Sequence, residues 1–292
     1  MKLFRAAGLW AAIFVVLVPL PVVAQDQGQF GRVIRIDRKA FQPNAGLIQF
    51  SEVALQSRNP VYRPNIYGAP PNGVTVTFAG FFEGQGIALP GQCPHGAIRQ
   101  GCINGTPLAP LRLSSRAPLT FTVRDTANPR SPSLSGSPTF NGPISMLFDK
   151  DVAGVGMMGG FFDAYRGTAI QAFDRNGNLI GGVKNIAKGM EYLALVTEDG
   201  RDRIAGVQFS LVGPEPAGYG IDDLSFAFST QIDRGQVPGL ADAAPATPRK
   251  DNAGGGGSLS DLFKDTGKAE KEPAPKAGGA EGGSLTDLFK SN

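Results

Sequence analysis

Three acidic side chains stand beside apolar segments, where they can hold a metal ion. Glu52 follows Phe50 at two-residue spacing, and Asp222 stands two residues before Leu224. Residues two apart in a strand share a face, so Glu52 and Asp222 are expected on the inward face at a sheet margin, with Asp223 adjoining. A buried carboxylate needs a partner, and Ca²⁺ accepts carboxylate and carbonyl oxygens. The pattern predicts structural calcium at these three residues; the alternative is that the acids end strands in solvent or cap turns.

The two cysteines, Cys93 and Cys102, are close in sequence, with His95 between them. In an oxidising compartment this pair predicts one disulfide that closes a small loop and stabilises the fold by roughly 2–3 kcal/mol. A metal or redox site using His95 is the alternative. It lacks the Cys-x-x-Cys spacing of redox motifs, and two thiols with one imidazole are too few for a closed zinc site.

Asp174, Asn176 and Asn178 have the spacing of the first ligands in an EF-hand loop. No closing glutamate follows, and no helical pattern flanks them. The Asn-Gly step at 176–177 is instead typical of a tight hairpin turn, because both residues tolerate positive φ. We therefore expect a hairpin here.

No catalytic motif is recognisable in the sequence. It contains no Gly-x-Ser-x-Gly nucleophile elbow and no phosphate-binding glycine loop. The expectation is a protein without enzymatic activity. A carboxylate pair distant in sequence escapes such a search, so a polysaccharide-acting hydrolase stays as an alternative.

The C-terminal region carries a duplicated nine-residue motif. The segment from Gly256 recurs from Gly282 with one change, Ser260 for Thr286. Each copy places two leucines and a phenylalanine at i, i+3 and i+4, which is one face of a helix too short to be stable alone. We expect these faces to fold into a groove on a protein partner, with avidity from two copies; the alternative is low-complexity duplication without a receptor. The expected partner-binding residues are Leu259, Leu262, Phe263, Leu285, Leu288 and Phe289.

Short segments of alternating polarity, separated by glycine- and proline-rich breaks, occupy the middle of the chain. Period-two alternation predicts antiparallel strands with one buried face, and many such strands without a helical segment predict an all-β, jelly-roll-like antiparallel β-sandwich. The expected strands cover 45–53, 74–78, 119–123, 144–148, 169–173, 179–183, 192–196, 207–211 and 224–228. The segment 90–143 is expected to form long loops over this sandwich.

The chain begins with the pattern of a secretory signal peptide. Lys2 and Arg5 precede an apolar run, and small residues end at Ala24. The apolar run is broken by prolines and falls short of the ~20 residues of a membrane-spanning helix. The expected organisation is a signal peptide at 1–24, a short segment at 25–31, a sandwich at 32–235 and a disordered tail at 236–292. The location is therefore periplasmic or extracellular, without a stable membrane anchor after cleavage.

Composition limits the choice of partner. Formal net charge is +3, and two of the cations, Lys2 and Arg5, leave with the signal peptide. The remaining charge near +1 makes nucleic acid an unexpected partner. The only tryptophan, Trp10, leaves too, which weighs against a sugar-binding platform built on tryptophan.

The middle of the chain resembles the exported bacterial β-sandwich domains of PEP-CTERM-type proteins, which are jelly-roll, galactose-binding-like modules. The resemblance lies in Ile48–Glu52, in 144–148 with Val155-Gly156, in 172–178 and above all in Gly220–Phe226. It implies a calcium ion between an early strand acid and a late Asp-Asp pair, here Glu52 and Asp222. The chain ends in Phe-Lys-Ser-Asn, without the hydrophobic helix and arginines of the sorting signal.

Together these patterns predict a non-enzymatic, exported, envelope-associated binding protein. Its sandwich is expected to act as a scaffold with a ligand-binding loop face, and its tail to recruit a protein partner. A carbohydrate-binding module is the first alternative, and a hydrolase the second.

Overall fold

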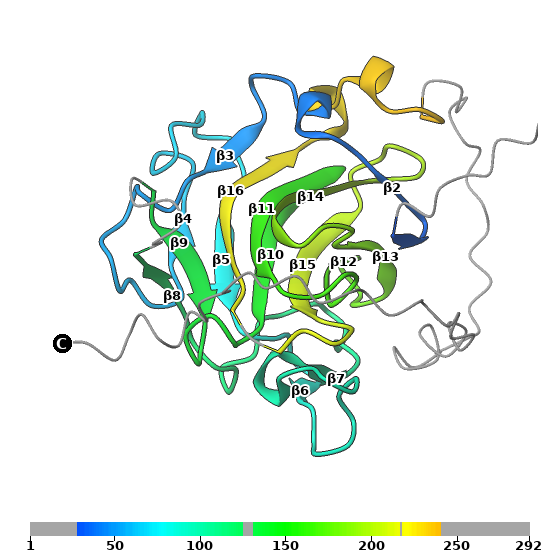
Figure 1. Cartoon of the computed structure of the whole chain (residues 1–292). Coiled ribbons are helices and arrows are strands. Elements are labelled where there is room, and N and C mark those ends of the chain that lie inside the picture. The colour runs from blue at the N-terminus through cyan, green and yellow to red at the C-terminus, as the bar shows by residue number, and fades with distance from the viewer. Residues whose placement is uncertain (1–27, 125–130, 217, 241–292) are drawn as a thin grey trace, which may run out of the picture.

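The fold is an antiparallel β-sandwich, which confirms the predicted fold class. The computed structural model describes residues 28–124, 131–216 and 218–240. Two sheets lie face to face, with β16 and β11 of one layer in front of β10 and β15 of the other (Figure 1). No helix in the described ranges is long and apolar enough to span a bilayer. The predicted signal peptide and both tail repeats lie outside the described residues.

The first sheet has seven strands in the order β1-β13-β12-β15-β10-β5-β4. All pairs within it are antiparallel. Its strands are β1 (Gln29–Gly31), β4 (Val61–Tyr62), β5 (Val76–Ala79), β10 (Ile144–Val152), β12 (Thr168–Phe173), β13 (Leu179–Lys184) and β15 (Ile204–Leu211).

The second sheet follows the order β2-β14-β11-β16-β9-β8, and β3 also pairs with β16. β9 contacts β16 at Ile221, whereas β3 contacts it from Leu224 to Phe226. The central strand therefore changes neighbours between these positions. The strands are β2 (Val33–Arg35), β3 (Gly46–Ile48), β8 (Thr120–Val123), β9 (Ser133–Gly136), β11 (Gly154–Phe162), β14 (Gly189–Thr197) and β16 (Gly220–Ala227).

A small lobe and four short 3-10 turns complete the described chain. β6 (Gln85–Ile87) and β7 (Ile103–Gly105) form the lobe, which projects from one end of the sandwich (Figure 1). The 3-10 turns are η1 (Arg38–Ala40), η2 (Arg99–Gly101), η3 (Ser229–Gln231) and η4 (Arg234–Gln236).

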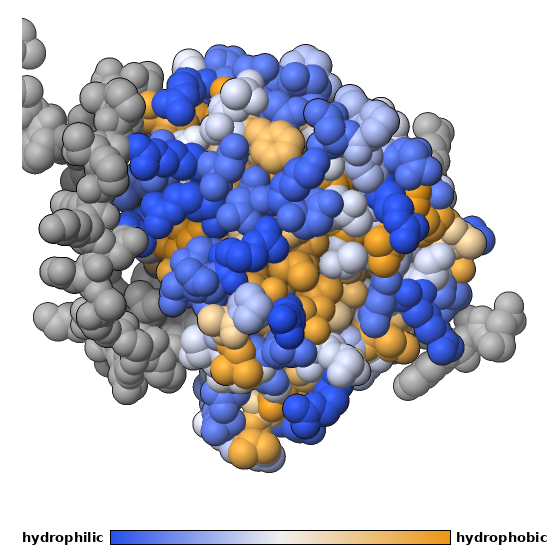
Figure 2. Space-filling model, turned by 180° about the vertical axis from the view of Figure 1, so that it is seen from behind, coloured by the Kyte–Doolittle hydropathy of each residue, from blue (hydrophilic) through white to orange (hydrophobic). Residues whose placement is uncertain are grey.

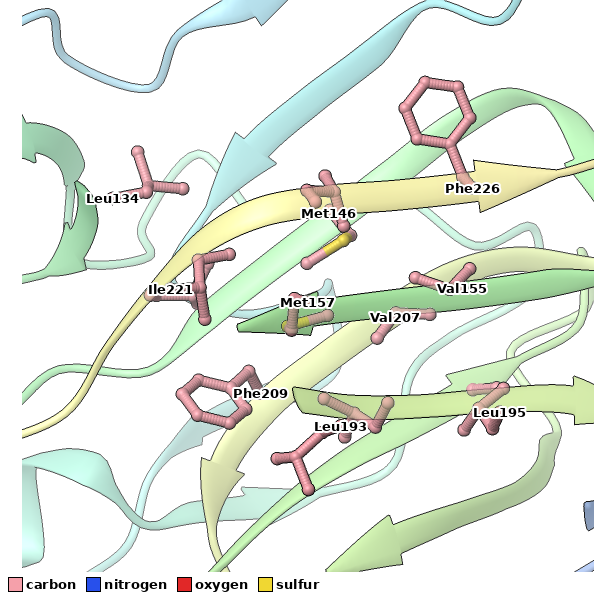
Figure 3. Close-up of a cluster of buried hydrophobic side chains, with 14 of the residues drawn as sticks. Leu134, Met146, Val155, Met157, Leu193, Leu195, Val207, Phe209, Ile221 and Phe226 are labelled. Carbon is pink, nitrogen blue, oxygen red and sulfur yellow. The ribbon is translucent and has the colours of Figure 1, made fainter. Parts of the chain in front are cut away.

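The core lies between the two sheets, as strand alternation requires. Met146 and Val207 of the first sheet face Val155 and Met157 of the second (Figure 3). These side chains are fully buried. Burial of a large apolar side chain contributes about 1.5–3 kcal/mol, so this interface is the main source of stability.

Apolar residues also cover part of each outer face of the sandwich. The sequence pattern, in contrast, predicts strands with one buried and one exposed face. Phe82 and Leu111 pack on Phe173 at the back of the first sheet. Val237 and Leu240 pack over the second sheet. Consequently β12 and β15 are buried along their whole length. The packed structure begins with β1 and reaches residue 240, slightly beyond the expected limits of 32 and 235 on each side.

Each strand expected from alternation has a counterpart, with one correction. The segment 45–53 is a strand only over Gly46–Ile48. Phe50 then takes a positive φ of 59°, which turns the chain out of the sheet. Glu52 therefore reaches its position from a turn.

On the rear face, apolar residues interrupt the polar surface near the centre and at the tip of the lower lobe (Figure 2).

Candidate functional site

The junction where β16 changes neighbours brings the predicted acids to one region. Opposite β11, two steps from Gly156 to Met158 match three steps from Ser225 to Asp222. β16 therefore carries one extra residue, a β-bulge, and Asp223 takes a positive φ of 48°. Because of this bulge, the neighbouring side chains of Asp222 and Asp223 lie in different surroundings.

Asp222 and Glu52 both lie close to Tyr62. Asp222 is 5% exposed, and its Oδ1 accepts a hydrogen bond from the Asp223 backbone N–H at 2.7 Å. Glu52 Oε1 accepts from the Gln49 backbone N–H at 2.8 Å. Burial raises the pKa of the Tyr62 hydroxyl far above its usual range, and the charges of Glu52 and Asp222 raise this pKa further. Two of the three predicted metal ligands thus act on one neighbour, the Tyr62 hydroxyl.

Two polar atoms of this junction have no hydrogen-bond partner. Glu52 Oε2 and the Tyr62 hydroxyl are buried, and neither forms a hydrogen bond within the described residues. An unsatisfied buried polar group costs about 1–3 kcal/mol, and more when it is charged. Asp222 also borders a cavity of about 20 Å³, which has room for about one water-sized species.

Asp223 takes a different role. Its Oδ2 accepts a hydrogen bond from Arg38 Nη2 at 2.9 Å. The Arg38 guanidinium also lies 4.5 Å from the centre of the Tyr192 ring. Asp223 is therefore a member of a surface ion pair beside the junction, and only Glu52 and Asp222 share the field at Tyr62.

The chemistry of the junction fits a hard cation in part. Glu52 Oε2 and the Asp222 carboxylate are oxygen donors of the kind that Ca²⁺ takes. Among the described residues no group of three or more acidic, histidine or cysteine side chains could hold a metal. A cation here would therefore need backbone carbonyls and water as its further ligands.

An open groove of about 650 Å³ lies at the edge of the second sheet. Its walls are the segments 43–47 and 67–74, together with Phe226, Phe228 and η3. No charged side chain lines it. The Tyr67 ring packs edge-on against Phe226 with centroids 5.5 Å apart. Binding sites of 300–1,000 Å³ with apolar walls and a few amides are common for small ligands.

Hydrogen bonds brace both walls of this groove. Gln231 Nε2 donates to the Asn44 carbonyl, and the Tyr67 hydroxyl donates to the Val74 carbonyl. Lys150 Nζ donates to the Gly73 carbonyl at 3.1 Å. A groove braced in this way needs little ordering when a ligand binds.

The predicted disulfide is present. Cys93 and Cys102 are bonded, with 5.8 Å between their Cα atoms, and Cys102 also bridges to Leu211 of β15. The disulfide thus closes a loop within the small lobe, and the backbone bridge from Cys102 to Leu211 joins this lobe to the first sheet. His95 is exposed on the loop that it closes.

The Asp174 segment is the expected hairpin turn between β12 and β13. Asp174 Oδ1 accepts hydrogen bonds from the backbone N–H groups of Asn176 and Asn178, both at 2.9 Å. Gly177 has a φ of +80°. The carboxylate therefore closes the turn together with the backbone hydrogen bond from the Asp174 N–H to the Asn178 carbonyl at 3.0 Å.

Sequence reasoning missed a buried acid, Glu215. Its side chain is completely buried and accepts hydrogen bonds from the backbone N–H groups of Asp163 at 2.9 Å and Ala164 at 3.2 Å. Burial raises its pKa to about 7, against the lowering effect of these hydrogen bonds. Nothing in the local sequence signals this role, because the donors come from 51 and 52 residues earlier. The groove and Tyr62 were missed for the same reason.

Comparisons with known proteins add little. No family model and no curated protein matches this chain. Among solved structures, it is similar to the enzymatically active domain of tailspike protein 4 from bacteriophage CBA120, with 19% identity. The match covers 37% of this chain and 17% of the other, with a TM-score of 0.24. So low a score carries no argument about function.

Proposed function

We propose that this protein is an exported, non-enzymatic binding protein. Its sandwich holds an uncharged ligand in the groove, and its C-terminal repeats recruit a protein partner. The disulfide is compatible with export to an oxidising compartment. The carrying observation is the braced groove of about 650 Å³ with its uncharged lining.

The groove supports binding of a neutral ligand. A charged ligand would lose its hydration there without meeting a charged side chain in return. Leu47 offers apolar surface, with 39% of the residue exposed, while Asn44 and Asn72 add amides. This combination suits a peptide backbone or another uncharged chain that carries hydrogen-bonding groups.

The tail repeats support the second half of the proposal. Leu259, Leu262 and Phe263, with their counterparts in the second copy, give two identical apolar triplets. Because they are linked, the second copy would bind at a raised effective concentration after the first has bound.

Two sets of variants test ligand binding in the groove and partner binding by the tail repeats separately. Leu47→Glu puts a charge into the groove and is expected to abolish ligand binding, with partner recovery from envelope extract unchanged. Val61→Glu, at an equally exposed residue (39%) on β4 outside the groove, is the matched control. Serine at Leu259, Phe263, Leu285 and Phe289 is expected to abolish partner recovery only. Recovery that survives these four changes would refute the tail's role.

A carbohydrate is the second candidate for the groove ligand. The observation in favour is the aromatic ring of Tyr67 beside the amides of Asn44 and Asn72 in an uncharged groove. A glycan array probed with the wild type and with Leu47→Glu tests it. A signal that Leu47→Glu removes supports the sugar, and an array without signal rules it out for the glycans tested.

Calcium at the acidic junction is a structural proposal beside this function. It rests on the unpartnered Glu52 Oε2 and on the position of Asp222. A cation there would fix the turn that carries Glu52 against β16. The expected sign is a higher melting temperature in calcium than in chelator, and equal melting curves would count against it.

A further inference from the structure

The groove at the edge of the second sheet has walls that match the apolar face of a tail repeat. Its exposed or half-buried lining includes three apolar residues and two aromatic rings: Pro43, Leu47, Pro70, Tyr67 and Phe228. Aromatic rings pair favourably in edge-on and offset arrangements, so a phenylalanine is a suitable occupant beside them. A volume of about 650 Å³ seats a few side chains of a short segment.

Each tail repeat carries side chains of this kind. In a helix, Leu259, Leu262 and Phe263 share one face, while Asp261 and Lys264 point to the opposite face. The two opposite charges leave the repeat neutral, and among the described residues that line the groove none is charged. An apolar helix face in an apolar groove is an established mode of peptide recognition.

The described chain ends at an apolar cluster that borders this groove. Gln42 donates its backbone N–H to the carbonyl of Gln231, a groove residue, at 2.9 Å. The next residue, Ile232, belongs to the same buried cluster as Leu240, and Ala45 of the groove wall packs against that cluster. The tail therefore begins beside the groove.

The tail is long enough to bring a repeat to the groove. Fifteen residues, 241–255, precede the first copy, and fully extended they span about 50 Å. The radius of gyration of a domain of the described size is about 17 Å. The first copy can therefore reach the groove with slack, at an effective concentration on the order of 1 mM.

We propose, building on the ligand groove of the proposed function, that one tail repeat of the same chain docks in this groove through its two leucines and its phenylalanine. The first copy has the shorter tether and is the main occupant, because effective concentration falls as a linker exceeds the length that it must span. With one groove and two copies, the other copy stays available to a partner. An external ligand must displace the docked repeat to enter the groove.

Binding of a labelled repeat peptide tests the proposal. The probe is a fluorescent peptide of residues 256–264, and the protein is the chain from Gln25 onward. Serine at Leu259, Phe263, Leu285 and Phe289 removes both tethered competitors, and this four-serine variant is expected to bind the peptide. For a dissociation constant of about 100 μM and a tail at about 1 mM, the wild type should bind it about tenfold more weakly. Fluorescence anisotropy measures both affinities.

Changes in the groove show where the peptide binds. In the four-serine background, Leu47→Glu and Thr230→Lys, at exposed groove residues, are each expected to weaken peptide binding roughly tenfold or more. Val61→Glu, as exposed as Leu47 but outside the groove, is the matched control and should leave the affinity unchanged. A peptide with serine at Leu259 and Phe263 is the control probe and should not bind. Melting curves verify that each variant is folded.

Three results would overturn the proposal. They are absence of peptide binding to the four-serine variant, binding that both groove variants retain, and equal affinities of the wild type and the four-serine variant. A wild-type dimer that the four serine changes dissociate, seen in sedimentation analysis, would instead assign the groove to the tail of a second copy. The proposed function fails by a different result, namely partner recovery from envelope extract that survives the four changes.

Discussion

Glu215 and Glu52 are both carboxylates withdrawn from solvent, yet their surroundings differ. Both oxygens of Glu215 accept a backbone N–H, one from Asp163 and one from Ala164. Glu52 has one oxygen bonded to the Gln49 N–H, while Oε2 is buried without a hydrogen-bond partner. Backbone N–H groups therefore satisfy both oxygens of Glu215, and this carboxylate has a structural role. Glu52 keeps one oxygen that can still accept a hydrogen bond or bind a cation, as a binding site requires.

Removal of the Glu215 side chain should have the largest effect. Glu215→Ala leaves two backbone N–H groups without acceptors in a buried place, and each unsatisfied group costs about 1–3 kcal/mol. We expect a loss of roughly 3 kcal/mol in the free energy of unfolding, measured with chemical denaturant. A loss below about 1 kcal/mol would show that water replaces the carboxylate, and the contrast with Glu52 would weaken.

The pH dependence of stability should be the next largest effect. Burial raises the folded-state pKa of Glu215 to about 7, above its ordinary value of 4.5. The folded state therefore holds the proton more tightly, and this stability is present at low pH and lost as pH rises through about 7. The unfolding free energy should fall by about 2–3 kcal/mol between pH 5 and pH 8. In Glu215→Gln this fall should be absent; an unchanged profile would assign the dependence to another group.

Glu52→Gln should show a smaller effect that depends on calcium. The amide keeps an acceptor for the Gln49 N–H, so stability without calcium should change by less than about 1 kcal/mol. In the wild type, calcium at a hundredfold excess over its dissociation constant should add about 2.7 kcal/mol, and the variant should gain much less. Thermal melts in calcium and in chelator measure both. An equal calcium shift in the two proteins would place the cation elsewhere.

Tyr62→Phe should have the smallest effect on stability. Its hydroxyl is buried and forms no hydrogen bond with the described residues, so its removal leaves no partner unsatisfied. We expect a change within about 0.5 kcal/mol in the absence of calcium. Denaturant titration checks this, with the fully buried Phe50→Leu as a control for packing loss beside the same ring. A loss above about 1 kcal/mol would reveal a bridging water at the hydroxyl.

Alternation in the sequence predicts the sandwich well, but it misses one of the central strands. β11 reads Gly-Val-Gly-Met-Met-Gly-Gly-Phe-Phe, and glycine lacks the side chain that makes alternation visible. Those glycines are required by packing. A Cβ at Gly156 would lie 2.6 Å from the Tyr192 hydroxyl oxygen. The signal for this strand is therefore in the residues that cover it, which are distant in sequence.

The candidate site, like the fold, can be predicted from the sequence only in part. Parity predicts Glu52 on the inward face of a strand, whereas Glu52 lies in a turn after β3. Glu52 and Asp222 nevertheless both raise the pKa of Tyr62. Parity cannot foresee the bulge that directs Asp223 towards Arg38. It also cannot foresee Glu215, whose partners are set by the way two loops meet.

The packing of the last described residues has a mechanical consequence. Val237 and Leu240 are buried against the outer face of the second sheet, only a short distance in sequence after β16. A force on the C-terminal region must first pull Val237 and Leu240 out of their apolar contacts before the force acts on β16. That strand is held by hydrogen bonds along both edges, to β11 on one side and to β3 and β9 on the other. A partner tethered through the C-terminal repeats would thus exert its load on one of the best-anchored strands of the molecule.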